Sequence, residues 1–235
     1  MSVEEIDQLK ARADAALNNI TFTLSYEDAA RDCDLVIEAI AENPEEKIAF
    51  YTELAKHLPE KTIIATNSST MLPSAFAQYT GRPKKYLALH FANEIWRNNT
   101  AEVMGHPETS KQAYDDVAEF AETISMIPLK LQKEQPGYIL NSLLVPFLSA
   151  AEELLATGVA DCETIDKTWM LATGAPLGPF RILDIVGLTT AYNIGIMDPR
   201  SKDPGTVQGK VAALLKGYID EGKTGVNAGE GFYKY

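Results

Sequence analysis

The sequence is short of several residue types, and each shortage narrows the class of protein. Its only cysteines, Cys33 and Cys162, are too few for a disulfide framework and lack the spacing of a metal site. The three histidines, His57, His90 and His106, also lack ligand spacing, so no metal site is expected. No apolar run approaches the ~18 residues of a membrane span, and the charged N-terminus has no signal-peptide core. These absences favour a cytoplasmic protein.

Basic residues are also in the minority. The formal net charge of −12 argues against nucleic acid and anionic membranes as main partners, although a single site could still be locally positive. What the chain does have is apolar: 46% of its 235 residues are hydrophobic, enough for a substantial core. The length allows one large domain or two modest ones.

Short apolar runs alternate with helical patterns in the first part of the chain. Such alternation favours a mostly parallel sheet with right-handed crossovers. The run 34–40 is nearly all apolar, as expected of a strand covered on both faces. Strands are predicted at 20–23, 34–40, 62–67, 86–92, 101–105 and 127–132, and helices at 3–17, 25–31, 44–58, 71–79 and 110–126.

The pattern changes after Gln135-Pro136-Gly137, because only helical periodicity follows. We predict a domain boundary near 134–137, with an α/β domain at 1–134 and an all-α domain at 135–235. The first helix of the second part, 138–155, is too apolar for a face exposed to water, which predicts a homodimer through this domain.

Polar residues follow several predicted strands, where the ligands of parallel sheets gather. His90 closes one apolar run, and Glu102 lies in the next. Histidine suits general acid–base chemistry near neutral pH, and a carboxylate on its far nitrogen would orient it. We therefore predict that His90 is a base and Glu102 its partner, with side chains in hydrogen-bond reach.

Each of these residues also has a structural interpretation. A histidine at a strand end is often only hydrogen-bonded, and Glu102 by itself is typical of a surface carboxylate. Ser68 and Ser69 stand where a helix cap is needed. Asn141 inside an apolar helix either needs buried partners or faces solvent.

Beyond these local patterns, the chain resembles the 3-hydroxyacyl-CoA dehydrogenases, especially small bacterial members acting on 3-hydroxybutyryl-CoA or related acyl-CoAs. The resemblance runs from about residue 20 to the C-terminus and rests on eight blocks in the family's order: DLVIEAIAENPEEK, IIATNSST, ALHFAN, AEVM, EQPGYILNSLLVPFLSAAEELL, GVADCETIDKTW, GAPLGPFRILDIVGL and GEGFYKY. It implies a Rossmann-like domain followed by a helical substrate and dimerisation domain.

The resemblance also assigns roles to residues. It implies that His90 removes the proton of a 3-hydroxyl while a hydride leaves for NAD, and that Glu102 holds His90. Ser69 and Asn141 would hydrogen-bond the substrate's oxygens. The family's cofactor contacts match Glu42, Lys47, Ser69 and Asn93.

The chain departs from the family pattern in three places. His90-Phe91-Ala92-Asn93-Glu94 replaces the usual His-Phe-Phe-Asn-Pro, which bears on substrate preference, and Asn227 replaces a lysine that contacts the cofactor. The largest departure is at the front, where the family's Gly-x-Gly-x-x-Gly turn is missing: the first glycine is Gly81. That turn holds the pyrophosphate of the dinucleotide, so we expect weak or absent NAD binding in this chain.

The missing front also affects the expected sheet, an N-terminally truncated Rossmann-like sheet in which two strand positions separate 20–23 from 34–40. We expect 20–23 to pair with 34–40, or the N-terminal helix to fold across that edge, or a second chain to cover it. Two other functions stay open. One is a related 3-hydroxy-acid dehydrogenase of the gulonate-oxidising type, and the other is a non-catalytic oligomerising or acyl-CoA-binding protein.

Overall fold

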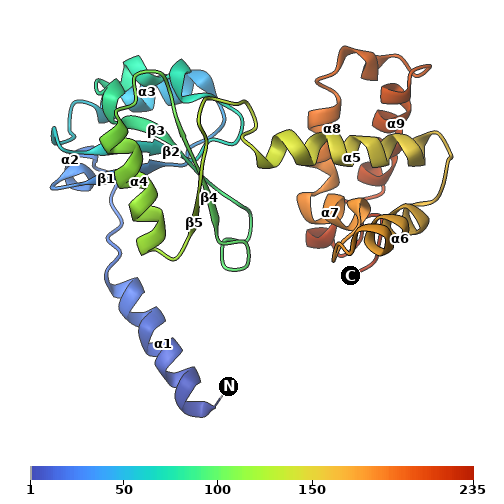
Figure 1. Ribbon diagram of the computed structural model, residues 1–235, viewed down its shortest axis with the longest axis horizontal. Coiled ribbons are helices and arrows are strands. Elements are labelled where there is room, and N and C mark those ends of the chain that lie inside the picture. Colours follow the sequence, from blue (N-terminus) through green and yellow to red (C-terminus); the bar gives the residue numbers. More distant parts are fainter. Residues whose placement is uncertain (1) are drawn as a thin grey trace. The chain divides into compact units, whose positions relative to one another are not determined.

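The computed structural model describes residues 2–235, which form two compact units. One unit runs up to Ile139 and contains the strands, and the other, Leu140–Tyr235, is helical. Figure 1 shows the change from sheet to helices along the chain. No helix within residues 2–235 is long and apolar enough to cross a membrane.

A five-stranded sheet forms the centre of the first unit, and its strands lie in chain order. They are β1 (Leu35–Glu38), β2 (Ile63–Thr66), β3 (Tyr86–Phe91), β4 (Thr100–Gly105) and β5 (Ile127–Lys130). The pairs β1–β2, β2–β3 and β4–β5 are parallel, whereas β3 and β4 are antiparallel. The prediction of a mostly parallel α/β sheet is confirmed.

Helices of this unit begin at side-chain caps that the sequence supplies. They are α1 (Val3–Asn18), α2 (Tyr26–Ala30), α3 (Pro44–Leu54) and α4 (Lys111–Thr123), with 3-10 turns η1 (Pro73–Ala75), η2 (Ala77–Thr80) and η3 (Pro83–Lys85). The caps are Ser2, Ser25, Asn43 and Ser110, whose side-chain oxygens accept backbone N–H groups of the first turn. Where the sequence predicted a helix at 71–79, the structure has two 3-10 turns, η1 and η2.

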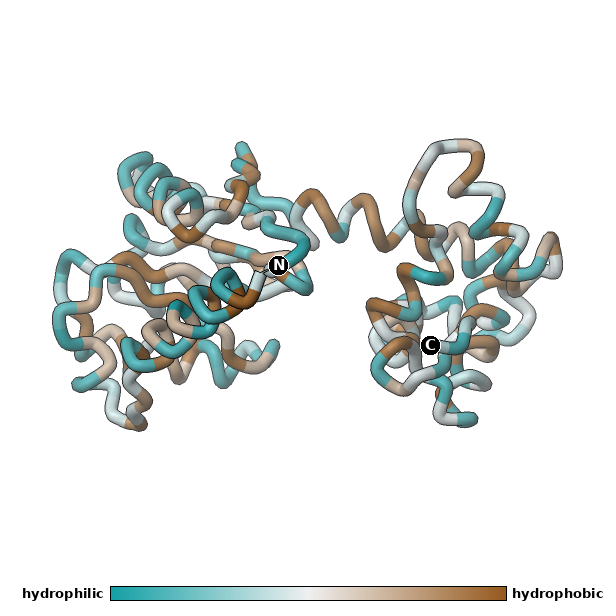
Figure 2. The backbone as a smooth tube through the Cα atoms, turned by 90° about the horizontal axis from the view of Figure 1, so that it is seen from below, coloured by the Kyte–Doolittle hydropathy of each residue, from teal (hydrophilic) through white to brown (hydrophobic). Residues whose placement is uncertain are grey.

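The sheet is covered on both faces, which makes three layers. Alternation along β2 and β3 sends Ile64 and Tyr86 to one face, where they pack with Tyr51 of α3. Ala65 and Leu87 point to the other face, where Val117 and Ala118 of α4 pack on them. Figure 2 shows hydrophobic stretches of backbone within this unit.

The N-terminal prediction is partly wrong. Residues 20–23 form no strand, and α1 has no buried residue, so neither of them covers the outer edge of β1. Burial of the 34–40 run is also less complete than predicted, since Ile37 of β1 is 39% exposed. A short β-branched run forms a strand only if a partner strand lies beside it, and the described chain places none next to 20–23.

The second unit is built from α5 (Leu140–Ala156), α6 (Cys162–Thr173), α7 (Pro179–Val186), α8 (Leu188–Gly195) and α9 (Val207–Asp220), with 3-10 turns η4 (Pro199–Lys202) and η5 (Val226–Ala228). Its core includes Leu148, Phe180, Leu183 and Leu215. Helix α5 continues through Pro146, so the proline does not end it. The all-α prediction for this part is confirmed.

Two buried aspartates attach the C-terminal tail to this unit. Asp184 of α7 accepts the N–H groups of Phe232 and Tyr233 at 2.8 and 3.0 Å. Asp166 of α6 accepts the N–H of Phe180 and the hydroxyl of Tyr233. These bonds satisfy carboxylates that would otherwise be costly to bury, and they fix the tail against α7.

Candidate active site

Strands β3 and β4 place His90 directly opposite Glu102. Directly opposed residues of antiparallel strands point to the same face, with Cβ atoms about 4.5–5.5 Å apart. Nδ1 of His90 lies 3.1 Å from Oε2 of Glu102, and both side chains are more than nine-tenths buried. The predicted hydrogen-bonded dyad is present in this geometry, and the twelve-residue spacing is explained by the strand register.

The loop after β2 places Ser69 on the other side of the imidazole. Oγ of Ser69 is 3.2 Å from Nε2 of His90, and Ser69 is half-buried. When Nδ1–H donates to the carboxylate, Nε2 keeps its lone pair and faces this hydroxyl. Ser69, His90 and Glu102 thus form a continuous array that ends at the hydroxyl of a half-buried serine.

Two residues that sequence reasoning missed complete this array. The ring of Tyr138 stacks on the ring of His90, with centroids 4.4 Å apart and planes 15° apart. The N–H of Ile139 donates to Oε1 of Glu102 at 2.9 Å. The one available signal was the Gln135-Pro136-Gly137 turn, which ends the α/β pattern immediately before an aromatic residue.

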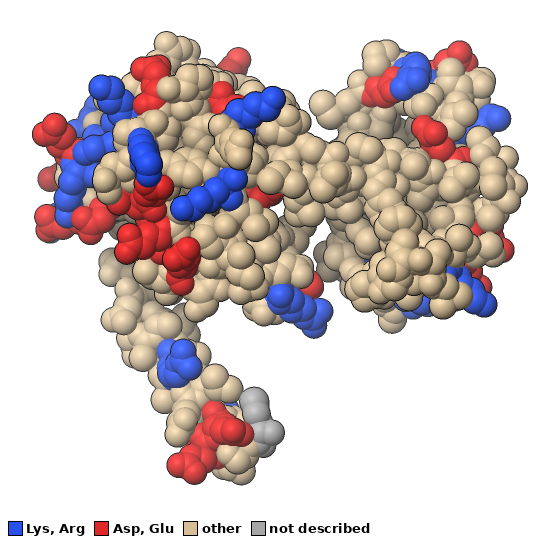
Figure 3. Space-filling view, in the orientation of Figure 1, with Lys and Arg blue, Asp and Glu red and all other residues tan. Residues whose placement is uncertain are grey.

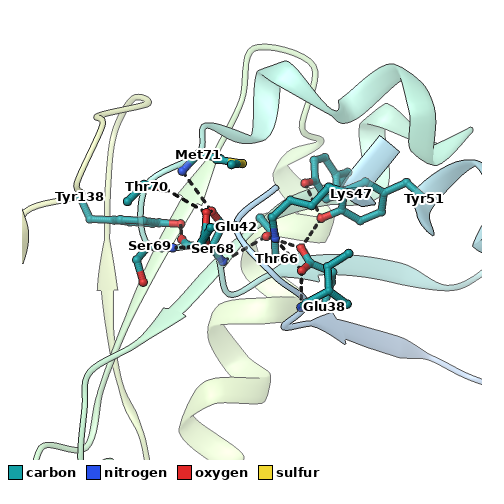
Figure 4. Close-up of polar contacts among 12 residues, drawn as sticks. Glu38, Glu42, Lys47, Tyr51, Thr66, Ser68, Ser69, Thr70, Met71 and Tyr138 are labelled. Carbon is teal, nitrogen blue, oxygen red and sulfur yellow. Dashed lines mark hydrogen bonds and ion pairs between the residues drawn. The ribbon is translucent and has the colours of Figure 1, made fainter. Parts of the chain in front are cut away.

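Glu42 is the anchor of the loop that carries Ser69. Its carboxylate accepts the hydroxyls of Ser68 and Thr70 and the N–H of Ser69, at 2.8–3.1 Å. Figure 4 shows these groups converging on Glu42, with Tyr138 approaching Ser68. Ser68 also accepts the N–H of Met71, but this bond closes a local turn and caps no helix, because the next 3-10 turn, η1, begins after Leu72 without a side-chain cap.

Lys47 lies apart from the array, in a buried network under β1. Its Nζ is 2.7 Å from Oε1 of Glu38, and both side chains are at most 1% exposed. Burial raises the pKa of Glu38, but hydrogen bonds from Lys47, Tyr51 and Thr66 outweigh it and lower that pKa (Figure 4). The ammonium group of Lys47 therefore has a structural partner.

The remaining predicted site residues are less enclosed. Asn93 is exposed in the loop between β3 and β4, where its carbonyl accepts the side-chain amide of Asn98. Asn141 is half-buried in the first turn of α5, in the helical unit. Of the predicted residues, the first unit thus joins Glu42, Ser69, His90 and Glu102 in one chain of contacts. No cluster of three or more potential metal-ligating side chains occurs within residues 2–235.

The chemistry of this array is proton transfer. A buried imidazole whose far nitrogen faces a carboxylate can accept a proton on Nε2, because the carboxylate stabilises the imidazolium that forms. Parallel strands β1–β3 end beside it, the position at which open α/β sheets bind dinucleotides. A general base beside the position where such sheets bind dinucleotides is the arrangement that a nicotinamide-dependent dehydrogenase requires.

Comparisons with known proteins agree with this class. The family model for the 3-hydroxyacyl-CoA dehydrogenase NAD-binding domain matches residues 2–135, and that for the C-terminal domain matches 137–235. The chain therefore belongs to the 3-hydroxyacyl-CoA dehydrogenase family. A probable 3-hydroxybutyryl-CoA dehydrogenase of Deinococcus radiodurans is 33% identical over 99% of this chain and 82% of its own length.

Solved structures extend the comparison. A diketoreductase, described as acting on dicarbonyl compounds, is 56% identical, with a TM-score of 0.89 over 95% of this chain and 77% of its own. The (S)-3-hydroxybutyryl-CoA dehydrogenase PaaH1 of Ralstonia eutropha is 27% identical, with a TM-score of 0.81 over 99% of this chain and 83% of its own.

The residues present fit the family's cofactor, NAD, only in part. Glu42, Ser69 and Asn93 follow β1, β2 and β3 and offer polar groups at the carboxyl ends of these strands. Glycines that could form a pyrophosphate-binding turn are missing before Gly81. The described chain thus supplies the part of a dinucleotide site that lies over β1–β3.

Proposed function

We propose that this protein catalyses the NAD-dependent oxidation of a 3-hydroxyacyl-CoA to the 3-oxoacyl-CoA, and the reverse reduction. The observation that carries the proposal is the Ser69–His90–Glu102 array at the carboxyl edge of a nucleotide-binding sheet. Family membership supports the same chemistry. When bound, NAD supplies the acceptor for the hydride that leaves C3 of the substrate.

The protein's own residues handle the proton. Nε2 of His90 takes the proton of the 3-hydroxyl as the C3–O bond becomes a carbonyl, and Glu102 stabilises the resulting imidazolium. The hydroxyl of Ser69, already 3.2 Å from Nε2, donates to the same substrate oxygen and orients it. Asn141, with its half-buried amide, is proposed to hydrogen-bond an oxygen of the substrate's acyl group.

The cofactor contacts proposed for this chain are Glu42, Ser69 and Asn93, whereas Lys47, the fourth residue that the family pattern assigns to the cofactor, is proposed as a structural residue. Exposed carboxylate and amide groups support Glu42 and Asn93. The buried ion pair of Lys47 supports a different use, in which the lysine holds β1 and α3 together beneath the cofactor. We propose the domain roles accordingly, with residues 1–134 carrying the cofactor and 135–235 the substrate and dimer contacts.

A second candidate is the reduction of a dicarbonyl compound that carries no CoA. It is favoured by the 56% identity to the diketoreductase, well above the identity to the acyl-CoA relatives. The loop after His90, with Glu94-Ile95-Trp96, also departs from the family pattern, and Trp96 is 76% exposed there. The proton chemistry of His90 is the same for either substrate.

A substrate panel followed at 340 nm tests the proposal. NADH oxidation is measured with acetoacetyl-CoA, longer 3-oxoacyl-CoAs, a 3,5-dioxo ester and a 3-keto sugar acid, each at the same NADH concentration. Preference for an acyl-CoA supports the proposal, whereas preference for the dioxo ester supports the second candidate. The sugar acid tests the gulonate-type alternative.

Calorimetric titration with NADH separates an enzyme from a non-catalytic protein. The titration measures what the polar groups of Glu42, Ser69 and Asn93, at the carboxyl ends of β1–β3, contribute to NADH binding. Ordinary micromolar affinity would show that the glycine turn contributes less than expected. No saturable binding together with no signal at 340 nm would contradict the enzyme and favour the acyl-CoA-binding or oligomerising alternative.

We infer a homodimer formed through the helical unit. Helix α5 is predominantly hydrophobic (Figure 2), and Leu140, Leu143 and Leu154 on it are 41–69% exposed. Much of the face of this unit in Figure 3 carries no charge, whereas charges of both signs cover the first unit. Apolar surface of this kind usually marks an interface. Light scattering at micromolar concentration should give twice the 25.7 kDa of one chain; a monomer alone would contradict the inference.

The cytoplasm is the compartment that we propose. Both cysteines are free, which suits a reducing environment. Cell fractionation with an antibody to the chain tests this, and recovery in an organelle or outside the cell would contradict it.

A further inference from the structure

The ring of Tyr138 stacks on the His90 imidazole, and the reaction described above does not use this contact. The two rings are nearly parallel, with centroids 4.4 Å apart. At this separation and tilt the aromatic face covers one side of the imidazole. Rotation of His90 about its last side-chain bond would break this stack and both of its hydrogen bonds, to Glu102 and to Ser69.

Tyr138 is itself held rigidly. It is 1% exposed, and its hydroxyl donates to the carbonyl of Ser68 at 2.7 Å. Burial raises the pKa of this phenol, so it stays protonated and remains a donor. The hydroxyl thus joins the ring that covers His90 to the loop that presents Ser69.

The backbone of Tyr138 also indicates a required position. Its φ of 55° lies in the left-handed region, which is unfavourable for a residue other than glycine. Gly137, with a φ of 76°, precedes it, and the N–H of Tyr138 donates to the carbonyl of Gln135. Glycine would adopt this φ without strain but could not supply the ring that stacks on His90.

The next residue contacts the other member of the dyad. The N–H of Ile139 donates to Oε1 of Glu102, the oxygen that does not face His90. Two successive residues therefore hold His90 through a ring and Glu102 through a backbone amide. Both residues lie in the turn after β5, outside the strands that carry His90 and Glu102.

We propose that Tyr138 is a positioning residue, whose ring fixes the plane of the His90 imidazole and whose hydroxyl ties that ring to the Ser69 loop. The expected effect of Tyr138 on turnover rests on the proposed function. The contact between its ring and His90 can be tested whether or not the protein is active. Ring contact and hydroxyl contact are separable, because phenylalanine keeps the first and leucine keeps neither.

The kinetic test compares Tyr138→Phe with Tyr138→Leu. With the ring kept, kcat should stay within about threefold of the parent; without it, kcat should fall about 10- to 100-fold with little change in KM, as expected when a reacting group is displaced by a fraction of an ångström. Tyr86→Leu is the matched control, because Tyr86 is a buried tyrosine of the same strand as His90 that contacts Tyr51. It should lower stability without this selective loss of kcat.

The structural test needs no turnover. In the parent protein, nuclear Overhauser effects should connect ring protons of His90 and Tyr138, and ring current should shift the His90 signals upfield; His90→Gln identifies these signals among three histidines. Tyr138→Phe should keep the shift and Tyr138→Leu should abolish it. Missing Overhauser effects in the parent, or an unchanged kcat in an active Tyr138→Leu protein, would overturn the proposal. If no substrate is turned over, the proposed function fails while the NMR result still decides the placement.

Discussion

Glu102 holds His90 through one carboxylate oxygen and is itself held through the other. Oε2 lies 3.1 Å from Nδ1 of His90, and Oε1 accepts the N–H of Ile139 at 2.9 Å. The carboxylate therefore has little freedom to turn away from the imidazole. This arrangement lets Glu102 select the His90 tautomer in which Nε2 is the base.

The first prediction concerns this dyad. His90→Gln and Glu102→Gln should each lower kcat by about 10²–10⁴-fold, because the first removes the general base and the second removes the charge that stabilises the imidazolium. His106→Gln is the control: Nε2 of this buried histidine donates to the carbonyl of Pro83 and its Nδ1 accepts the N–H of Glu108, both of which lie outside the array. Steady-state assays at 340 nm measure kcat of each variant, and circular dichroism checks that each variant is folded. Turnover within threefold of the parent in His90→Gln would exclude His90 as the base.

The second prediction separates two adjacent serines. Ser69→Ala should lower kcat about 10- to 100-fold without loss of stability, since Oγ of Ser69 faces Nε2 of His90 in a half-buried position. Ser68→Ala should instead lower the free energy of unfolding by about 1–3 kcal/mol, because buried Ser68 donates to Glu42 and accepts the N–H of Met71. Urea unfolding and kinetics on both variants give the comparison, and identical behaviour would contradict it.

The third prediction concerns the buried ion pair. Lys47→Met should lower the free energy of unfolding by about 3–5 kcal/mol, because the carboxylate of Glu38 stays buried without its cation. The double variant Glu38→Gln/Lys47→Met should recover part of this loss, since no charge is then left in the interior. Lys61→Met, which removes an exposed pair with Asp34, should have little effect. A Lys47→Met protein of parental stability but weaker NADH binding would make this lysine a direct cofactor contact.

The fourth prediction is a pH dependence of stability from Glu152 in α5. Burial, with a smaller contribution from Glu153, raises the pKa of Glu152 to about 7, and its Oε1 has no hydrogen-bond partner within residues 2–235. In the unfolded chain the group titrates near 4.3, so the folded state binds more protons between the two values. Stability from this group is therefore complete below about pH 4.3 and is lost as the pH rises to about 7, by roughly 3 kcal/mol.

Substitution of the carboxyl tests this assignment. Glu152→Gln stays neutral at every pH and should unfold at higher urea than the parent at pH 8, with a smaller difference near pH 5. The exposed residue Glu163 supplies the control, because Glu163→Gln should leave the difference between pH 5 and pH 8 unchanged. A parental pH profile in Glu152→Gln would assign the dependence to another group.

Local patterns were sufficient for most elements of the fold. Apolar runs predicted β2, β3, β4 and β5, and helical spacing of apolar residues predicted α3 and α4. The prediction of a strand at 20–23 was wrong because a strand depends on its neighbours, which a local pattern does not contain. For the same reason, the exposure of Ile37 could not be foreseen from the apolar run around it.

Part of the candidate site could likewise be predicted from the sequence, and part could not. His90 and Glu102 could be proposed from the sequence, because a histidine at the end of an apolar run and a carboxylate in the next run are local features. Their contact depends on the antiparallel register of β3 and β4, and the roles of Tyr138 and Ile139 depend on how the turn after β5 returns to the sheet. Residue types and periodicity determined which groups were available for chemistry. Only the tertiary structure decided which of them meet, because distances of a few ångströms between residues 12 to 48 positions apart are set by packing and strand pairing.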